Sequence, residues 1–248
     1  MRLQPASWWM PLPCQDSSTW PRIQSQLNQK WSSLNGFLDA LKQLHRRNNM
    51  NLLQQYFTLE GFDASLATWI SQCALRLPQL FPSGSIPRLH RGQDFAVSLS
   101  ETQVSCLLVN AFFGTFRLQA EDRRFHEFSM VNLVSGGNGN GRRGNAVYEK
   151  LKCIMHYFRR CMDRERAVGR STGIVTFHRK VLPRNSTNWL TVDLPISSIQ
   201  LEVFPEGRME DGCMHRSHVD FANKYIGGGA LGFVSFTSMV WICDLLFV

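Results

Sequence analysis

The residues best suited to chemistry lie in a short stretch toward the end of the sequence. Asp220 and Asn223 stand on a predicted strand, and three consecutive glycines, 227–229, follow it. Adjacent glycines leave backbone N–H groups unobstructed, so they can line a concave anion site and let a diphosphate approach the main chain. The carboxylate and the amide would then be placed to hydrogen-bond ribose hydroxyls or a base. A plain glycine-rich turn beside a surface aspartate explains these residues equally well.

A second glycine-rich stretch, Ser135 to Asn145, has the spacing of a dinucleotide-binding loop. It contains Gly139-x-Gly141-x-x-Gly144 and lies between a short apolar run and a predicted helix. Such a loop requires a strand–helix–strand unit, and no second parallel strand follows promptly. Glycine and asparagine at this density favour a flexible loop instead.

The elements that must position these residues begin as helices. Apolar residues recur at helical spacing from Pro21 to Leu44, and Ser18 and Thr19 are candidate caps for that helix. Asp63 can cap a second helix that runs through Cys73 and stops before Pro78.

Two further helices and then several strands follow. Residues 100–103, Ser-Glu-Thr-Gln, form a capping box that opens a helix reaching Phe112, and another helix is predicted from Ala146 to Cys161. Strands are predicted at Gly173–His178, Trp189–Leu194 and Ile199–Phe204. Strands after a helical block indicate a helical domain packed on an α/β or α+β sheet domain.

Composition limits the class of protein. The 248 residues (28.4 kDa) are 44% hydrophobic and 19% charged, which excludes wholesale disorder. The net charge of +8 suits a polyanionic partner, although a solvated basic surface is the commoner interpretation. The seven cysteines show no zinc-ligand spacing and predict a reducing compartment. The apolar tail, Phe233–Val248, is interrupted by Asp244 and is too short for a typical membrane span.

At the aspartate, asparagine and triple glycine the sequence closely resembles the poly(ADP-ribose) glycohydrolase family. The likeness continues, in the family's order, through several other stretches: Ala74–Pro78, Gln103–Phe116, Glu149–Lys152, Tyr157–Arg160 and Thr172–Phe177. Together they span roughly residues 53–231, and as a set they are highly specific.

The resemblance implies a mixed fold, α/β (α+β), with an N-terminal helical domain on an incomplete macrodomain-like α/β/α sandwich. Residues 1–20 are expected to form a disordered lead, 21–99 the helical accessory domain, 100–232 the N-terminal part of the catalytic domain, and 233–248 a divergent apolar tail. The resemblance also implies a monomer that works in the nucleus or the cytoplasm without a cofactor, a metal ion or a membrane. Its partners would be poly(ADP-ribose) or ADP-ribose and poly(ADP-ribosyl)ated proteins.

The resemblance also gives roles to individual residues. Asp220 matches the family's pocket aspartate, the catalytic-site residue of this chain, and Glu210 with its apolar neighbour matches the contact to adenosine. The substrate-binding set implied in this way is Met209, Glu210, Asn223, Gly227, Gly228 and Gly229.

The chain departs from the family after the triple glycine. The family continues to Gln-Glu-Glu, one Glu of which is the general acid, whereas no Glu follows Glu210 here. Cleavage of a glycoside needs a carboxylic acid to protonate the leaving oxygen. The reaction that the resemblance implies is hydrolysis of the ribose–ribose O-glycosidic bond of poly(ADP-ribose). Because this chain lacks the general acid, we expect it to be inactive or severely impaired. The alternatives are a non-catalytic ADP-ribose-binding fragment and a truncated product without function, with a tail from Phe233 that is translated non-coding sequence.

Overall fold

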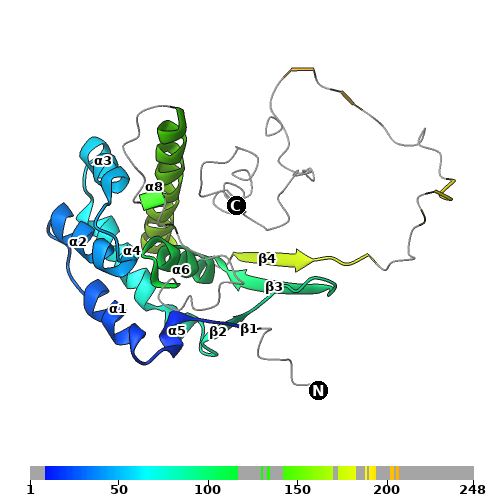
Figure 1. Ribbon diagram of the computed structural model, residues 1–248, viewed down its shortest axis with the longest axis horizontal. Coiled ribbons are helices and arrows are strands. Elements are labelled where there is room, and N and C mark those ends of the chain that lie inside the picture. Colours follow the sequence, from blue (N-terminus) through cyan, green and yellow to red (C-terminus); the bar gives the residue numbers. More distant parts are fainter. Residues whose placement is uncertain are drawn as a thin grey trace.

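The structure is a computed structural model that describes residues 9–116, 130, 133–134, 142–169, 173–182, 188, 190–193, 202–203 and 205–206, with the backbone alone at 142–145. Its helical elements are the 3-10 turn η2 (Pro13–Gln15), α1 (Thr19–Leu27), α2 (Leu34–His45), α3 (Asn51–Glu60), α4 (Ala64–Leu75), α5 (Leu77–Leu80), α6 (Glu101–Phe112) and α8 (Arg142–Val168). Two antiparallel ribbons accompany them, β1 (Trp9–Pro11) with β2 (Ser85–Pro87) and β3 (Phe95–Ser100) with β4 (Ile174–Arg179). In Figure 1 the helices gather on one side and the β3–β4 ribbon projects from them.

The long helix predicted from Pro21 to Leu44 is two helices, so that prediction was wrong in its continuity. The Ser33 hydroxyl accepts a hydrogen bond from the Gly36 amide at 3.3 Å and starts α2. Such a side-chain cap competes with continuation of the preceding helix. Trp31 lies between the two helices, is 5% exposed, and donates its indole N–H to the Ser71 hydroxyl at 2.9 Å. The apolar positions remain buried because the break does not move them out of the core.

The start of α1 also differs from the prediction. Ser18 and Thr19 do not cap it with their own side chains; instead the Asp16 carboxylate accepts from both of their amides, at 2.9 and 3.1 Å. These and the hydroxyl hydrogen bonds lower the pKa of Asp16, with Thr19 the largest cause.

The predicted caps of α4 and α6 are confirmed. Asp63 accepts from the amides of Ser65 and Leu66 at 2.9 and 3.0 Å, and α4 ends at Leu75, before Pro78. A further short helix, α5, then begins with Pro78 in its first turn, where a missing N–H costs nothing. At α6, Ser100 and Gln103 exchange the two hydrogen bonds of the capping box.

The second half agrees in part with the sequence. The strand predicted at Gly173–His178 is β4, whose partner β3 was not predicted. Helix α8 is longer than the predicted helix at both ends and begins at Arg142, inside the stretch interpreted as a loop up to Asn145. Residues 190–193 are not a strand, because Thr191 closes a turn onto the Asn188 carbonyl at 3.0 Å. Glu202 and Val203 are not in a strand either, and the predicted strand Val219–Asn223 lies outside the described residues.

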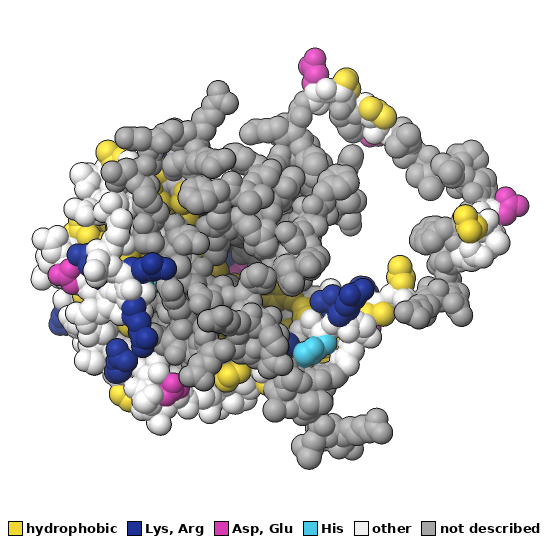
Figure 2. All heavy atoms as spheres, viewed as in Figure 1, with side chains coloured by type: hydrophobic (Ala, Val, Ile, Leu, Met, Phe, Trp, Pro, Cys, Tyr) yellow, Lys and Arg dark blue, Asp and Glu magenta, His cyan; other side chains and the backbone are white. Residues whose placement is uncertain are grey.

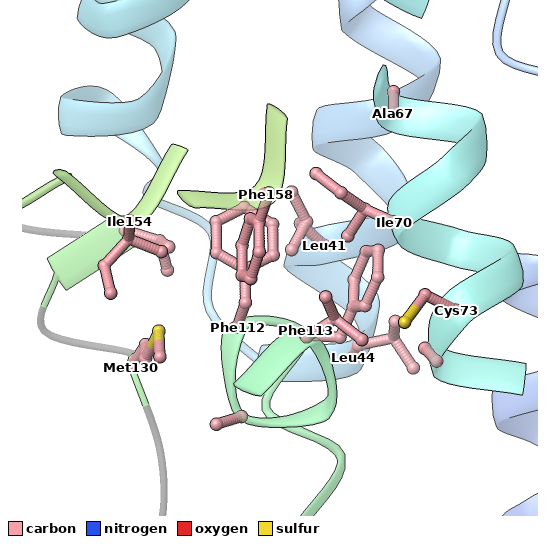
Figure 3. Packing of buried hydrophobic residues seen from close by; sticks show 14 of the residues in the cluster. Leu41, Leu44, Ala67, Ile70, Cys73, Phe112, Phe113, Met130, Ile154 and Phe158 are labelled. Carbon is pink, nitrogen blue, oxygen red and sulfur yellow. The ribbon is translucent and has the colours of Figure 1, made fainter. Parts of the chain in front are cut away.

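One hydrophobic core joins the helices of the described chain. Phe37 from α2, Phe112 from α6 and Phe158 from α8 are fully buried, as is Phe113, which follows α6. Edge-to-face contacts link the rings, with centroids 6.1 Å apart for Phe37–Phe113 and 5.7 Å for Phe112–Phe158. Figure 3 shows the rings of Phe112, Phe113 and Phe158 beside side chains of α2 and α4. The core includes residues on both sides of Ser100, the boundary that the sequence suggested.

The described fold is therefore mixed: a helical unit with two small antiparallel sheets. This bears out the helical part of the predicted fold class. The strands of the predicted macrodomain-like sandwich fall largely on residues outside the described part, so the sandwich stays a prediction.

Candidate functional site

The residues predicted to form the substrate site lie outside the described part of the chain. They are Met209, Glu210, Asp220, Asn223, Gly227, Gly228 and Gly229. The structure describes the helices and the β3–β4 ribbon, which precede these residues in the chain. Two polar regions lie in this described part.

The first polar region is a small cleft between α4, α6 and α8, with a volume of about 30 Å³. That volume admits one or two water molecules. Sites for drug-sized ligands and cofactors are about ten times larger. The cleft is therefore a polar junction of three helices rather than a nucleotide pocket.

Glu165 anchors one side of the cleft. One carboxylate oxygen lies 2.7 Å from Arg76 Nη1, and the other accepts from the Trp69 indole N–H at 2.8 Å. The side chains of Arg76 and Glu165 are 23% and 30% exposed. Because this ion pair is partly removed from water, separating α4 from α8 or removing one partner would leave a partly shielded charge without its counter-charge.

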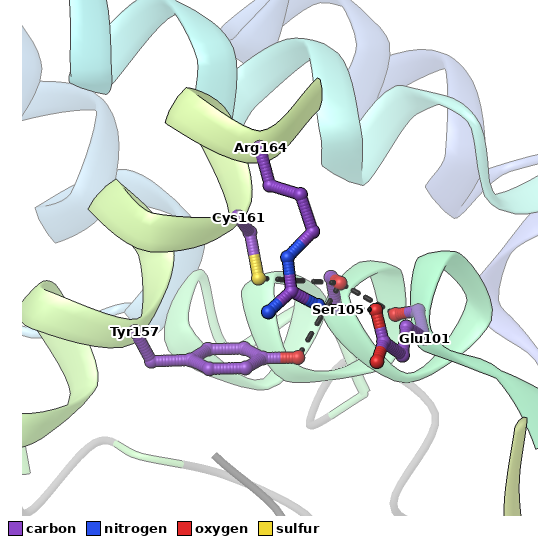
Figure 4. Close-up of polar contacts among 5 residues, drawn as sticks. All are labelled: Glu101, Ser105, Tyr157, Cys161 and Arg164. Carbon is purple, nitrogen blue, oxygen red and sulfur yellow. Dashed lines mark hydrogen bonds and ion pairs between the residues drawn. The ribbon is translucent and has the colours of Figure 1, made fainter. Parts of the chain in front are cut away.

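Glu101 forms the opposite side of the cleft. Its carboxylate pairs with Arg164 at 2.8 Å, and its amide donates to the Gly173 carbonyl at 3.0 Å. A Cβ added at Gly173 would collide with the Glu101 carboxylate. The start of α6, the end of α8 and the residue before β4 thus meet at Glu101, which fixes where the ribbon leaves the helices. Figure 4 shows Glu101 and Arg164 at this point.

Between these pairs lie groups that could act as nucleophiles or acids in other settings. The Ser105 hydroxyl donates to the Glu101 carbonyl at 2.6 Å and lies 3.4 Å from the Tyr157 hydroxyl and 3.8 Å from Cys161 Sγ. Burial raises the pKa of Cys161 and of Tyr157, so both stay protonated at neutral pH. The pKa of Cys73 is raised too, first by its hydrogen bond with Cys106 and then by burial. In the structure Ser105, Tyr157 and Cys161 contact one another and pack α6 against α8.

Glu101 and Arg164 were not identified as site residues from the sequence. Arg164 and Glu165 lie just beyond Cys161, where the predicted helix stopped, so the sequence carried only a weak signal for them. Charged residues at the end of a helix are usually solvated. Only the packing of α4 and α6 against α8 shows that Arg164 and Glu165 form internal ion pairs.

The second polar region is the β3–β4 ribbon. Val97 faces Phe177 and Leu99 faces Val175 on a half-buried apolar face, while Ser98 and Thr176 meet on the other face with hydroxyls 2.8 Å apart. At the outer end the His178 ring lies 2.6 Å from an Asp94 carboxylate oxygen. This hydrogen bond is the main cause that lowers the pKa of Asp94.

The described residues contain neither a candidate metal site nor a helix suited to crossing a membrane. No group of three or more His, Cys, Asp and Glu side chains in this part of the chain lies close enough together to hold a metal ion. None of its helices combines the length and the apolar character needed to cross a membrane.

Comparisons with known proteins address the same region. Residues 58–179, from the end of α3 to the end of β4, match the family described as poly(ADP-ribose) glycohydrolase, helical domain. The chain is 37% identical over 148 residues to poly(ADP-ribose) glycohydrolase 1 of Arabidopsis thaliana, covering 58% of this chain and 25% of that protein. It is 30% identical over 148 residues to probable poly(ADP-ribose) glycohydrolase 2 of the same plant, covering 55% of this chain and 27% of that protein.

The helical unit is thus of the class found in poly(ADP-ribose) glycohydrolases. These matches support membership of the poly(ADP-ribose) glycohydrolase family, in agreement with the sequence resemblance. It spans about a quarter of the length of the curated relatives that it matches.

Proposed function

We propose that the chain acts on poly(ADP-ribose) and holds its ADP-ribose units through the stretch that follows β4. The observation that carries this proposal is the family match over residues 58–179, which takes in α4, α5, α6, α8 and the β3–β4 ribbon. Asp220 and Asn223 would bind ribose, Met209 and Glu210 the adenosine part, and Gly227–Gly229 the diphosphate. The fold that presents them would be the macrodomain-like sandwich, with β3 and β4 leading into it.

The reaction that we propose for the family site is hydrolysis of the ribose–ribose O-glycosidic bond, the work of a glycoside hydrolase. A general acid is needed to protonate the leaving oxygen, and a positioned acid contributes about 10²–10⁴ in rate. Because the 248-residue sequence has no Glu after Glu210, we propose that this polypeptide by itself binds ADP-ribose and cleaves the polymer slowly or not at all.

The setting that we propose is the nucleus or the cytoplasm, with poly(ADP-ribosyl)ated proteins as partners and the chain as a monomer. The five cysteines of the described part are all free thiols, which suits a reducing compartment.

Thermal unfolding of the 248-residue polypeptide with and without ADP-ribose tests binding. A specific ligand at about 100 times its dissociation constant adds about 2.7 kcal/mol to the free energy of unfolding. We expect a raised melting temperature that is lost in Asp220→Asn and in Asn223→Ala. The matched control is Asp193→Asn, an exposed aspartate in the chain segment between β4 and the proposed site, which should keep the full shift.

A second measurement separates binding from cleavage. Release of ADP-ribose from poly(ADP-ribose) is compared with a boiled sample and with Asp220→Asn. If the unmodified polypeptide releases more ADP-ribose than the boiled sample and than Asp220→Asn, it retains a general acid for hydrolysis. That result would contradict the proposal that it binds without cleaving. A melting temperature that does not respond to ADP-ribose would contradict the proposed site.

A further inference from the structure

The outer end of the β3–β4 ribbon gathers basic side chains from two distant parts of the sequence. Arg88 and Arg91 lie in the segment before β3, and Arg179 and Lys180 lie at the end of β4. The antiparallel register, which pairs Phe95 with Arg179, brings the segments together. Arg179 then donates from Nη1 to the Leu89 carbonyl at 3.2 Å. We call Arg88, Arg91, Arg179 and Lys180 the ribbon-end basic patch.

A single acidic residue, Asp94, lies in segments 88–94 and 178–182. Its carboxylate is engaged by His178 at 2.6 Å and by the Val181 amide at 3.4 Å, and the charge of nearby Lys180 also contributes to lowering the pKa of Asp94. Arg91 and Lys180 are exposed, and neither forms an ion pair with a carboxylate of the described residues. Figure 2 shows Lys and Arg side chains gathered at this end of the ribbon, beside a His.

Several basic residues around α8 are held differently. Arg76 pairs with Glu165, Arg164 with Glu101, Arg159 with Asp63 and Lys152 with Glu60. These four cations are each matched by a neighbouring carboxylate. Exposed cations without such matching attract polyanions and release the counterions of phosphates that they contact.

We propose that the ribbon-end basic patch binds the phosphates of poly(ADP-ribose), as a contact additional to the residues that hold a single ADP-ribose unit. This inference rests on the proposed function. Each unit of the polymer carries a diphosphate, so one unit can occupy the site after β4 while another reaches the patch. Two contacts on one polymer act together, which raises affinity for the polymer above that for the monomer.

The geometry suits a flexible chain of phosphates. Arg179 is the last residue of β4 and is half-buried, whereas Lys180 follows the strand and is exposed. With Arg88 and Arg91 before β3, the patch takes in both chain segments at the outer end of the ribbon. An extended polymer can follow such a surface, whereas free ADP-ribose makes no use of it once the pocket is filled.

The test compares polymer and monomer binding by the 248-residue polypeptide and its variant Arg91→Gln/Lys180→Gln. These two side chains are exposed, and the bond from Arg179 to Leu89 stays in place. The probes are labelled poly(ADP-ribose) of defined length and ADP-ribose, measured over a series of salt concentrations. We expect affinity for the polymer to fall about five- to ten-fold, with the salt slope shallower by roughly 1.4 for two lost contacts. Affinity for ADP-ribose should be unchanged.

The matched control is Arg46→Gln/Arg47→Gln, which removes the same charge from an exposed site after α2. An equal loss of polymer affinity in this control would overturn the patch in favour of general charge attraction. Unchanged polymer affinity in the patch variant would also overturn the proposal. So would a single-stranded DNA of the same length that competes for the unmodified chain as well as poly(ADP-ribose) does. If neither ADP-ribose nor the polymer binds the unmodified chain, the proposed function fails; if only the patch variant behaves unexpectedly, the patch alone fails.

Discussion

Two regions of this protein use arginine in opposite ways. In the cleft between α4, α6 and α8, Arg76 and Arg164 each lie within 2.8 Å of a carboxylate and are partly shielded from water. At the ribbon end, Arg91 and Lys180 are exposed and form no ion pair with the described carboxylates. A charge that is paired and shielded contributes to the packing of helices. One that is exposed and unmatched contributes little to folding and remains available to a partner.

The strongest test of this contrast is Glu165→Ala in the cleft. The change leaves the Arg76 guanidinium and the Trp69 indole N–H without their shared acceptor. We expect the free energy of unfolding to fall by about 2–3 kcal/mol, measured by urea denaturation.

The control for that change is Glu149→Ala on the same helix, α8. Glu149 is 64% exposed and lies 3.8 Å from Lys152, so its loss should cost less than about 0.5 kcal/mol. An equal loss in the free energy of unfolding for the two variants would mean that the Arg76–Glu165 pair is as exposed to water as a surface pair. The contrast between the cleft and the ribbon end would then be wrong.

The next effect concerns the point where the ribbon joins the helices. In Gly173→Ala the new Cβ collides with the Glu101 carboxylate and pushes it from Arg164. We expect a loss of about 1–3 kcal/mol in the free energy of unfolding, from overpacking. Gly36→Ala in α2 is the matched control, because its nearest atom is 3.5 Å away and helical Ala is favoured by roughly 0.5–1 kcal/mol. A neutral Gly173→Ala would show that the junction is loose.

A smaller effect depends on pH at the ribbon end. The pKa of Asp94 is lower in the folded chain than in the unfolded chain, chiefly through its hydrogen bond with His178. Its contribution to stability is therefore complete above the unfolded carboxyl value of about 3.9 and is lost as the pH falls through the lower, folded value. Asp94→Asn should remove this part of the acid sensitivity in urea denaturation at pH 6 and pH 3. The same acid-induced loss in the variant and in the unmodified chain would contradict the assignment.

The smallest expected effect is on folding at the basic patch itself. Arg91→Gln should change the free energy of unfolding by no more than about 0.5 kcal/mol, as surface substitutions do. Arg76→Gln, the same substitution in the cleft, should cost about 1.5–3 kcal/mol because a charged hydrogen bond is lost. A lower free energy of unfolding in Arg91→Gln, beyond this amount, would mean that Arg91 stabilises the fold. That result would contradict the inference that its charge is available to a polyanion.

Local signals in the sequence were good guides to local structure. The Asp63 cap and the Ser100–Gln103 capping box were predictable because each needs only a side chain and the amides two or three residues ahead. The division of the predicted Pro21–Leu44 helix was not, since its apolar spacing continues across the break. The partner of Trp31 is Ser71, forty residues away in the chain, and no local pattern points to it.

The candidate functional residues also fall into those that local sequence indicated and those that it did not. Asp220, Asn223 and the triple glycine were found from residue type and spacing, and their roles remain predictions because they lie outside the described residues. The cleft residues and the basic patch were missed, because each is assembled from segments that are tens of residues apart.

By itself, the sequence indicated the family, the starts of α4 and α6 and the stretch proposed to hold ADP-ribose. These depend on short motifs in which every participating residue is a near neighbour along the chain. Only the tertiary structure decided which arginines are paired within the cleft and which are presented at the ribbon end. The physical reason is that charge pairing depends on distances between side chains, and those are set by how α4, α6, α8 and the ribbon pack, not by their order in the sequence.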